Sequence, residues 1–203
     1  MRKKDFKLIG EFIDKGNPKE ELNFALLRDG GFVATDIRKL IEFRLRGFKC
    51  EPMLVHKKVL KLVEGLLGKD DNVKVSSVGS VESGSVSISL SSANLDAFDK
   101  GEFKYSDYYK ILDVQLPQHF KLDKLDDIVF ELSQQNCFIE NSMLYPLIEH
   151  GDADWYEVFF KPQNGTDSGM VKIVAMQVID DAEFVAYTAV VMGRTFDSQA
   201  KGF

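Results

Sequence analysis

The first half of the sequence uses one pattern twice, a short amphipathic helix followed by about three short strands. The first helix is predicted over residues 3–15 and the second over residues 57–67, because their apolar residues recur at helical spacing. These residues are Phe6, Ile9, Phe12 and Ile13 in the first copy and Val59, Leu60, Val63 and Leu67 in the second. A duplicated unit of this kind is a structural repeat even though residue identity between the copies is low.

The strands of both copies are short and separated by turn residues. After the first helix we expect strands at 22–28, 31–36 and 39–46, with a turn at Asp29-Gly30-Gly31. After a strand at 53–55 and the second helix, we expect strands at 73–78, 85–90 and around 98–103. Segment 76–92 is rich in serine, but its apolar residues alternate with the serines, which favours a strand over a flexible linker. A hairpin turn is predicted at Glu82-Ser83-Gly84.

The second half follows a predicted linker at 112–119. We expect a third helix at 122–132, strands at 143–149, 155–161, 170–179 and 184–192, and no fourth helix. The prediction is an α+β fold of short helices and antiparallel sheets in two domains, 1–112 and 113–203, of which the second is shorter or divergent.

Charge is unevenly distributed along the chain. The net charge is −6, but residues 1–74 hold 17 Lys and Arg against 12 Asp and Glu, a balance of +5, which leaves −11 for the remainder. A basic region on an acidic protein can bind a polyanion if its side chains share one surface. The alternative is that these charges are ordinary solvated surface.

Several classes of protein are disfavoured. The two cysteines form neither a disulfide framework nor a zinc pair, the three histidines are scattered, and no catalytic constellation stands out, so we expect no metal, no cofactor and no enzyme. The longest apolar run near the end, residues 184–192, is too short to span a membrane. The N-terminus lacks the apolar core of a secretory signal, so a cytoplasmic protein is expected.

Aromatic residues in one predicted strand allow two interpretations. Trp155, Phe159 and Phe160 can form the core of the strand or a platform on which nucleic-acid bases stack. The core interpretation is favoured.

Four segments resemble the DNA sliding clamps, the ring-shaped DNA polymerase processivity factors of bacteria and their phages. Phe32-Val33-Ala34-Thr35-Asp36, followed by Arg38-Lys39-Leu40, is similar to a clamp signature strand. Residues 53–67 resemble a clamp strand and helix, and Gly101-Glu102-Phe103 with Asp107-Tyr108 is similar to a segment that closes a clamp domain. Residues 187–194, YTAVVMGR, look like the C-terminal clamp strand. The resemblance is good over residues 20–112 and weak over 113–180.

The resemblance implies a clamp fold whose ring encircles double-stranded DNA without reading its sequence and tethers replication proteins. A two-domain chain resembles the clamps that close as trimers, so a homotrimer formed through strand edges is expected. The implied partners are a DNA polymerase and a clamp loader. The implied DNA-binding residues are Lys3, Lys4, Lys7, Lys57, Lys58 and Lys61. The implied partner-peptide residues are Leu112, Leu116, Pro117, Phe120, Met192 and Arg194.

Alternatives remain open for each implication. The lysines can be exposed helix faces without a partner, and the apolar residues can simply fasten the two domains together. The third predicted helix is acidic, with Asp123, Asp126, Asp127 and Glu131, and would repel phosphate if it lined the hole. Either it faces elsewhere, or the hole is basic only in alternate sectors, or the protein is a clamp-fold adaptor that docks other proteins without encircling DNA.

Overall fold

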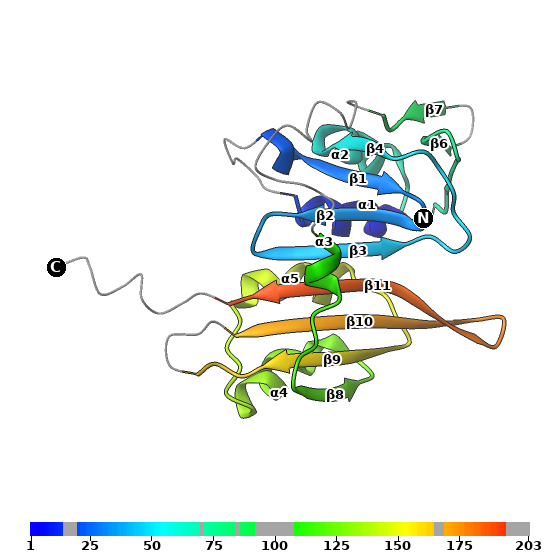
Figure 1. Ribbon diagram of the computed structural model, residues 1–203. Helices are drawn as coiled ribbons and strands as arrows, with labels where there is room; N and C mark the ends of the chain where they lie inside the picture. The colour runs from blue at the N-terminus through cyan, green and yellow to red at the C-terminus, as the bar shows by residue number, and fades with distance from the viewer. Residues whose placement is uncertain (14–19, 70, 84–85, 92–107, 165–168, 194–203) are drawn as a thin grey trace. The chain divides into compact units, whose positions relative to one another are not determined.

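The chain folds as two units, Met1–Tyr109 (unit 1) and Lys110–Phe203 (unit 2), each of which contains four antiparallel strands paired side by side (Figure 1). The computed structural model describes residues 1–13, 20–69, 71–83, 86–91, 108–164 and 169–193. Short helices and antiparallel strands make up both units, which confirms the predicted α+β class. The units divide after Tyr109, whereas the sequence analysis placed the domain boundary after residue 112.

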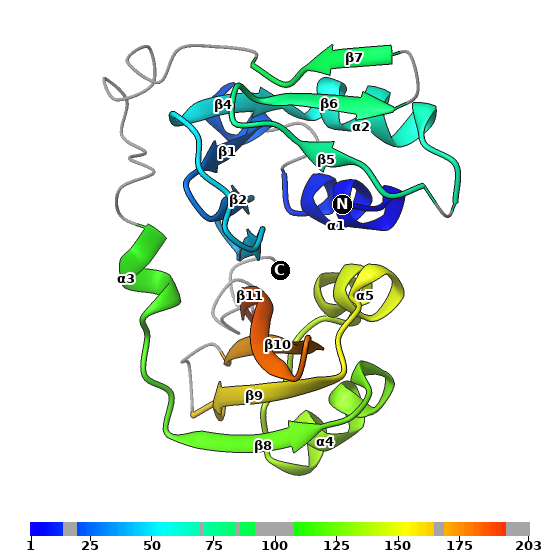
Figure 2. The same cartoon turned by 90° about the vertical axis from the view of Figure 1, so that its right-hand side faces the viewer.

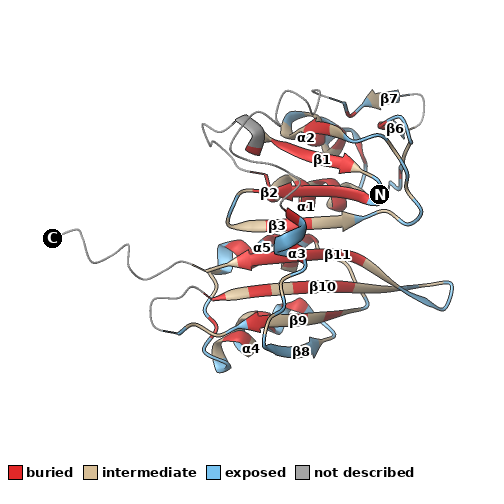
Figure 3. Cartoon of the chain, in the orientation of Figure 1, coloured by how far each residue is buried: buried red, intermediate tan, exposed pale blue. Residues whose placement is uncertain are grey.

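The main sheet of unit 1 has the strand order β4-β1-β2-β3. Its strands are β1 (Phe24–Arg28), β2 (Gly31–Thr35), β3 (Lys39–Arg44) and β4 (Met53–His56). β1 and β2 form a hairpin in which Arg28 pairs with Gly31, and Gly30 in the loop between them has a φ of 88°. This left-handed conformation favours glycine, so the predicted turn is confirmed. β1 and β2 are buried over nearly their whole length (Figure 3).

Two helices cover the main sheet of unit 1. These are α1 (Lys3–Glu11) and α2 (Lys57–Leu66), and a short 3-10 helix, η1 (Glu20–Asn23), precedes β1. Helical spacing puts Phe6 and Ile9 of α1 and Leu60 and Val63 of α2 on buried faces. Phe6 meets Phe32 of β2 edge to face, with ring centroids 6.5 Å apart, which ties α1 to the sheet.

The second copy of the repeat ends in a small sheet of order β5-β6-β7, with β5 (Lys74–Val75), β6 (Ser80–Ser83) and β7 (Val86–Ser89). Unit 1 therefore contains the predicted repeat, in which a helix precedes a meander twice. The strand predicted at 73–78 is only two residues long, and β6 was not predicted. Glu82 and Ser83 pair with Ser87 and Val86 as part of β6, so the turn predicted at Glu82-Ser83-Gly84 is wrong for these two residues, and Gly84 lies outside the described residues. The strand predicted around 98–103 lies outside the described residues.

Unit 2 has the strand order β11-β10-β9-β8. The strands are β8 (Gln118–Leu122), β9 (Trp155–Lys161), β10 (Met170–Ile179) and β11 (Ala182–Met192), and β9 and β10 have the predicted bounds. The helical elements are α3 (Tyr108–Leu112), which spans the division between the units, η4 (Leu125–Asp127), α4 (Ile128–Gln134) and α5 (Asn141–His150). α4 and α5 lie on the same side of the unit 2 strands (Figure 2).

Two predictions for unit 2 are wrong. The helix expected at 122–132 begins only at Ile128, because Leu122 belongs to β8 and pairs with Tyr156 of β9. The strand expected at 143–149 is helix α5, which makes it the fourth helix that the sequence analysis did not expect. Its buried residues Met143, Leu144 and Leu147 lie one and four positions apart, as on one face of a helix. A run this short also fits strand periodicity, and Pro146 within it weakens the helical signal.

Within the described residues, no helix is long and apolar enough to cross a membrane.

Candidate nucleic-acid interface

The two lysine-bearing helices of unit 1 lie side by side and run antiparallel. Lys3 near the start of α1 donates a hydrogen bond from Nζ to the carbonyl oxygen of Leu67, 3.2 Å away, just beyond the end of α2. At the opposite end, Gly10 and Glu11 of α1 lie against Lys57 at the start of α2. The positively charged Lys3 ammonium satisfies a carbonyl at the negative end of the α2 dipole, which fixes how the helices align.

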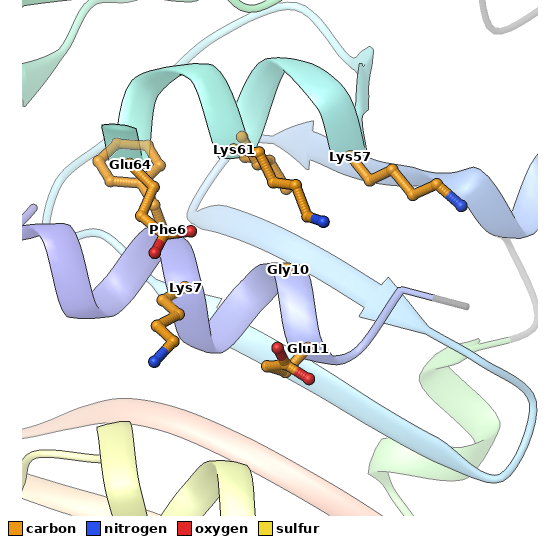
Figure 4. A pocket seen from close by; sticks show the side chains of 8 residues that line it. Phe6, Lys7, Gly10, Glu11, Lys57, Lys61 and Glu64 are labelled. Atoms are coloured by element: carbon orange, nitrogen blue, oxygen red, sulfur yellow. The ribbon is translucent and has the colours of Figure 1, made fainter. Parts of the chain in front are cut away.

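A shallow groove of about 290 Å³ runs between α1 and α2 (Figure 4). We call it the α1–α2 groove. Lys57 and Lys61 extend from α2, and Lys7 and Glu11 come from α1 (Figure 4). The full lining is Phe6, Lys7, Gly10, Glu11, Lys57, Leu60, Lys61 and Glu64.

The groove bears mixed charge with a positive excess. Its lysines outnumber its glutamates by three to two, and α1 and α2 together hold six lysines against Asp5, Glu11 and Glu64. Asp5 is buried and accepts a hydrogen bond from the backbone N–H of Arg2 at 2.6 Å, so it contributes little to the outer surface. Positive charge on an otherwise acidic chain is thus gathered on two adjacent helices.

The start of α2 has a charge distribution that does not favour helix stability. Lys57 and Lys58 occupy its first turn, and no acidic residue is present there. Cations at the positive end of a helix dipole cost about 0.3–1 kcal/mol. The turn is held by the side chain of His56, whose Nδ1 accepts a hydrogen bond from the Lys58 N–H at 3.0 Å. The dipole of α2 and its first-turn lysines therefore both contribute positive potential at the start of the helix, which is the sign that an anion-binding surface needs.

The six lysines named from the sequence take four different positions. Lys7, Lys57 and Lys61 line the groove, and Lys57 also donates a hydrogen bond to Asn23 Oδ1. Lys58 is exposed on α2 outside the groove lining, and Lys3 caps the end of α2. Lys4 is half-buried on α1. Lys61 is exposed and forms no ion pair within the described part of the chain.

The residues named for partner-peptide binding belong to unit 2. Leu112 is buried at the end of α3, Leu116 is half-buried and Pro117 is exposed in the segment that follows. Phe120 lies on β8 and packs on Phe160 of β9 with ring centroids 5.5 Å apart. Met192 is half-buried at the end of β11, and Arg194 lies outside the described residues.

The acidic members of the groove, Glu11 and Glu64, are not among the residues named from the sequence. Glu64 follows Lys57 and Lys61 at positions i+7 and i+3, so helical spacing alone would have placed it on the same stripe. Glu11 lies four residues after Lys7 for the same reason. In the described ranges, no three His, Cys, Asp or Glu side chains gather closely enough to hold a metal ion.

Comparison with known proteins gives similarity in structure but not in sequence. No family model matches the sequence, and no curated protein matches it at a significant level. The fold is similar to a crystal structure from Eubacterium rectale ATCC 33656 provisionally identified as a DNA polymerase III beta subunit, with 10% sequence identity and a TM-score of 0.47. The match covers 99% of this chain and 66% of that one, so this chain spans just under two thirds of the similar protein's length. At this identity and TM-score, the similarity carries no conclusion about the activity or the family of this chain.

Proposed function

We propose that the chain is a subunit of a DNA sliding clamp, a ring that encircles duplex DNA and tethers a DNA polymerase. The observation that supports this most is the gathering of Lys7, Lys57 and Lys61 at one groove between two antiparallel helices. Duplex DNA carries about one negative charge per ~1.7 Å of its axis, so such a surface attracts it without reading its sequence. Lysine suits sliding because its point charge on a flexible stem exchanges phosphates easily.

Ring closure is the second part of the proposal. β8 comes last in the strand order of unit 2, and an end strand offers unpaired backbone groups along one side. We propose that this edge pairs with a strand edge of unit 1 in the next subunit, and that three subunits complete the ring. Such head-to-tail contacts between identical chains form a closed ring when the rotations from one subunit to the next add up to a full turn.

Mass and DNA topology together test the proposal. At micromolar concentration, light scattering should give about 69 kDa, three times the 23.0 kDa of one chain. With the cognate loader, the ring should stay on nicked circular DNA and slide off the same DNA once it is cut. Ala substitutions at Lys57, Lys58 and Lys61 should weaken retention, whereas the exposed Lys49, paired with Asp29 at 3.1 Å, provides a matched control. A persistent monomer, or equal retention on circular and linear DNA, would refute encirclement.

One observation favours a second candidate function, a clamp-fold adaptor that docks replication or repair proteins without encircling DNA. The helices α4 and α5 of unit 2 contain Glu131 and Glu149 but no Lys or Arg, so they add nothing to DNA attraction. An adaptor should bind its partner proteins equally well with and without the lysines of α2. The retention assay separates the two functions, because an adaptor never remains on circular DNA.

A further inference from the structure

The unit 2 strands present two different faces. Along β9 the residues alternate, with Tyr156, Val158 and Phe160 buried and Trp155 and Phe159 half-exposed. The buried face packs toward α5. Gly151, the C-cap residue of α5, lies so close to the buried Tyr187 that a Cβ atom added to it would meet the Tyr187 hydroxyl. We call the opposite side, where β8, β9 and β10 lie side by side, the outer face. Its members include His119, Lys121, Trp155, Glu157, Phe159, Lys161 and Lys172.

Aromatic rings and cations are in contact on the outer face. The Lys121 ammonium lies over the Trp155 ring, 4.4 Å from its centroid, and the Lys172 ammonium lies 6.0 Å from the centroid of Phe159. The His119 imidazole stacks on Phe159, with ring centroids 4.6 Å apart and planes 27° apart. The flat imidazole of His119 therefore already covers the solvent-facing side of the Phe159 ring. Glu157 holds this imidazole through a contact with His119 Nε2.

The outer face collects most of the positive charge of unit 2. The described residues 110–164 and 169–193 contain five lysines, no arginine and 13 acidic residues. Three of those lysines, Lys121, Lys161 and Lys172, lie on the outer face, where Glu157 is the one acidic residue within the paired strands. The rest of the described unit is acidic, so an anionic ligand is directed to this face.

We propose that the outer face binds single-stranded nucleic acid without sequence preference, as a site separate from the α1–α2 groove. Aromatic rings interleaved with lysines are the combination that holds unpaired bases and their phosphates. Trp155 and Phe159 are four residues apart on one strand, about 13 Å at ~3.3 Å per residue. Neighbouring bases in a duplex are only about 3.4 Å apart along a strand, so bases on these two rings cannot be stacked on each other. Bases inside a duplex have both faces covered by their neighbours, so a base that stacks on either ring must come from a single strand.

Binding a base requires Lys121 to leave the Trp155 ring, and the exchange is favourable. An exposed cation–π contact is weaker than the stacking of a base on an aromatic side chain. The released ammonium then lies within reach of the phosphate of the same nucleotide. His119 likewise yields the ring of Phe159 to a base and remains tethered by Glu157.

Trp155 is the one tryptophan of the chain, so its fluorescence reports on this face directly. We expect oligonucleotides of about 12 residues, either oligo-dT or oligo-U, to quench it at low salt. If oligo-dT and oligo-U quench the fluorescence equally, the site binds single strands in general. If one of them quenches more strongly, the site prefers DNA or RNA accordingly. A duplex of the same length should leave the fluorescence unchanged. The full chain is used throughout.

Variants separate stacking from charge. Phe159→Leu should weaken binding by about 5- to 150-fold, whereas Phe159→Tyr, which keeps the ring, should bind like the parent chain. Lys121→Gln should reduce the slope of log affinity against log salt by about 0.7. Lys124→Gln provides the matched control, because Lys124 lies in the segment between β8 and η4.

Three results would overturn the site. These are no quenching by either oligonucleotide at low salt, equal quenching by the duplex or by an acidic peptide, and equal affinity of the Leu and Tyr variants at position 159. Lys57→Gln with Lys61→Gln should leave the quenching intact. Failure of this site is thereby distinguished from failure of the clamp function.

Discussion

Substitution of Lys61 tests the α1–α2 groove most directly, because this lysine is exposed and has no ion-pair partner within the described ranges. Each phosphate neutralised by a lysine contributes about −0.9 to the slope of log affinity against log salt for duplex DNA. If Lys7, Lys57 and Lys61 each neutralise one phosphate, the slope is about −2.7. Raising salt fourfold, from about 50 to 200 mM, then weakens binding about 40-fold.

Lys61→Gln removes one of these contacts. The slope should fall to about −1.8, and the same fourfold rise in salt should weaken binding only about 12-fold. Glu64→Gln is expected to act in the opposite direction, because it removes a carboxylate from the same groove and so strengthens binding. Anisotropy of a labelled short duplex, titrated at four or more salt concentrations, measures both effects.

The control is Lys49→Gln, which changes charge equally but removes an exposed lysine outside the groove. Its slope should equal that of the parent chain. A specific role for the α1–α2 groove is refuted if Lys49→Gln and Lys61→Gln lower the slope equally, because the attraction then depends on total charge. It is also refuted if Glu64→Gln weakens duplex binding, because the carboxylate then supports the site.

Further predictions concern stability and reactivity. Gly151→Ala should destabilise the fold by about 1–3 kcal/mol, because the added methyl group meets the Leu147 carbonyl. Gly10→Ala should stabilise α1 by about 0.5–1 kcal/mol, because no atom lies near the added methyl group. Urea unfolding measures both changes in stability. Burial raises the pKa of Cys137 to about 11, so at pH 8 only about one thiol in a thousand is ionised, and a thiol reagent should modify Cys50 first and Cys137 only on unfolding. Burial raises the pKa of Tyr187 well above its ordinary value, so this tyrosine ionises in the unfolded chain at a lower pH than in the folded one. The stability that is present below about pH 10 should therefore be lost as the pH rises. The loss should be smaller in Tyr187→Phe. Equal unfolding midpoints at pH 9 and 11 would contradict this last expectation.

Local periodicity predicted a large part of the fold. The alternating burial of Tyr156, Val158 and Phe160 records one covered face, and β9 has the predicted bounds. Helical spacing likewise located α1 and α2 within a few residues. The pattern failed where a run was short: residues 143–149 satisfy both strand and helix spacing, and only packing of α5 in unit 2 decides between them.

The candidate site was only partly predictable. The sequence identified the lysines of both helices, but spacing within one helix says nothing about which other helix lies beside it. Contact between α1 and α2 places Lys7 in one groove with Lys57 and Lys61 and adds Glu11 and Glu64 to its lining. It also brings Lys3 to the end of α2.

The sequence by itself located both helices and the first three strands of the repeated unit and showed which of their faces are apolar. Tertiary structure alone decided what covers those faces and which remain open. Trp155 and Phe159 illustrate the difference, since both were expected in a strand core but lie half-exposed among lysines. The physical reason is that periodicity records a pattern along one element, whereas burial depends on neighbours from distant parts of the chain.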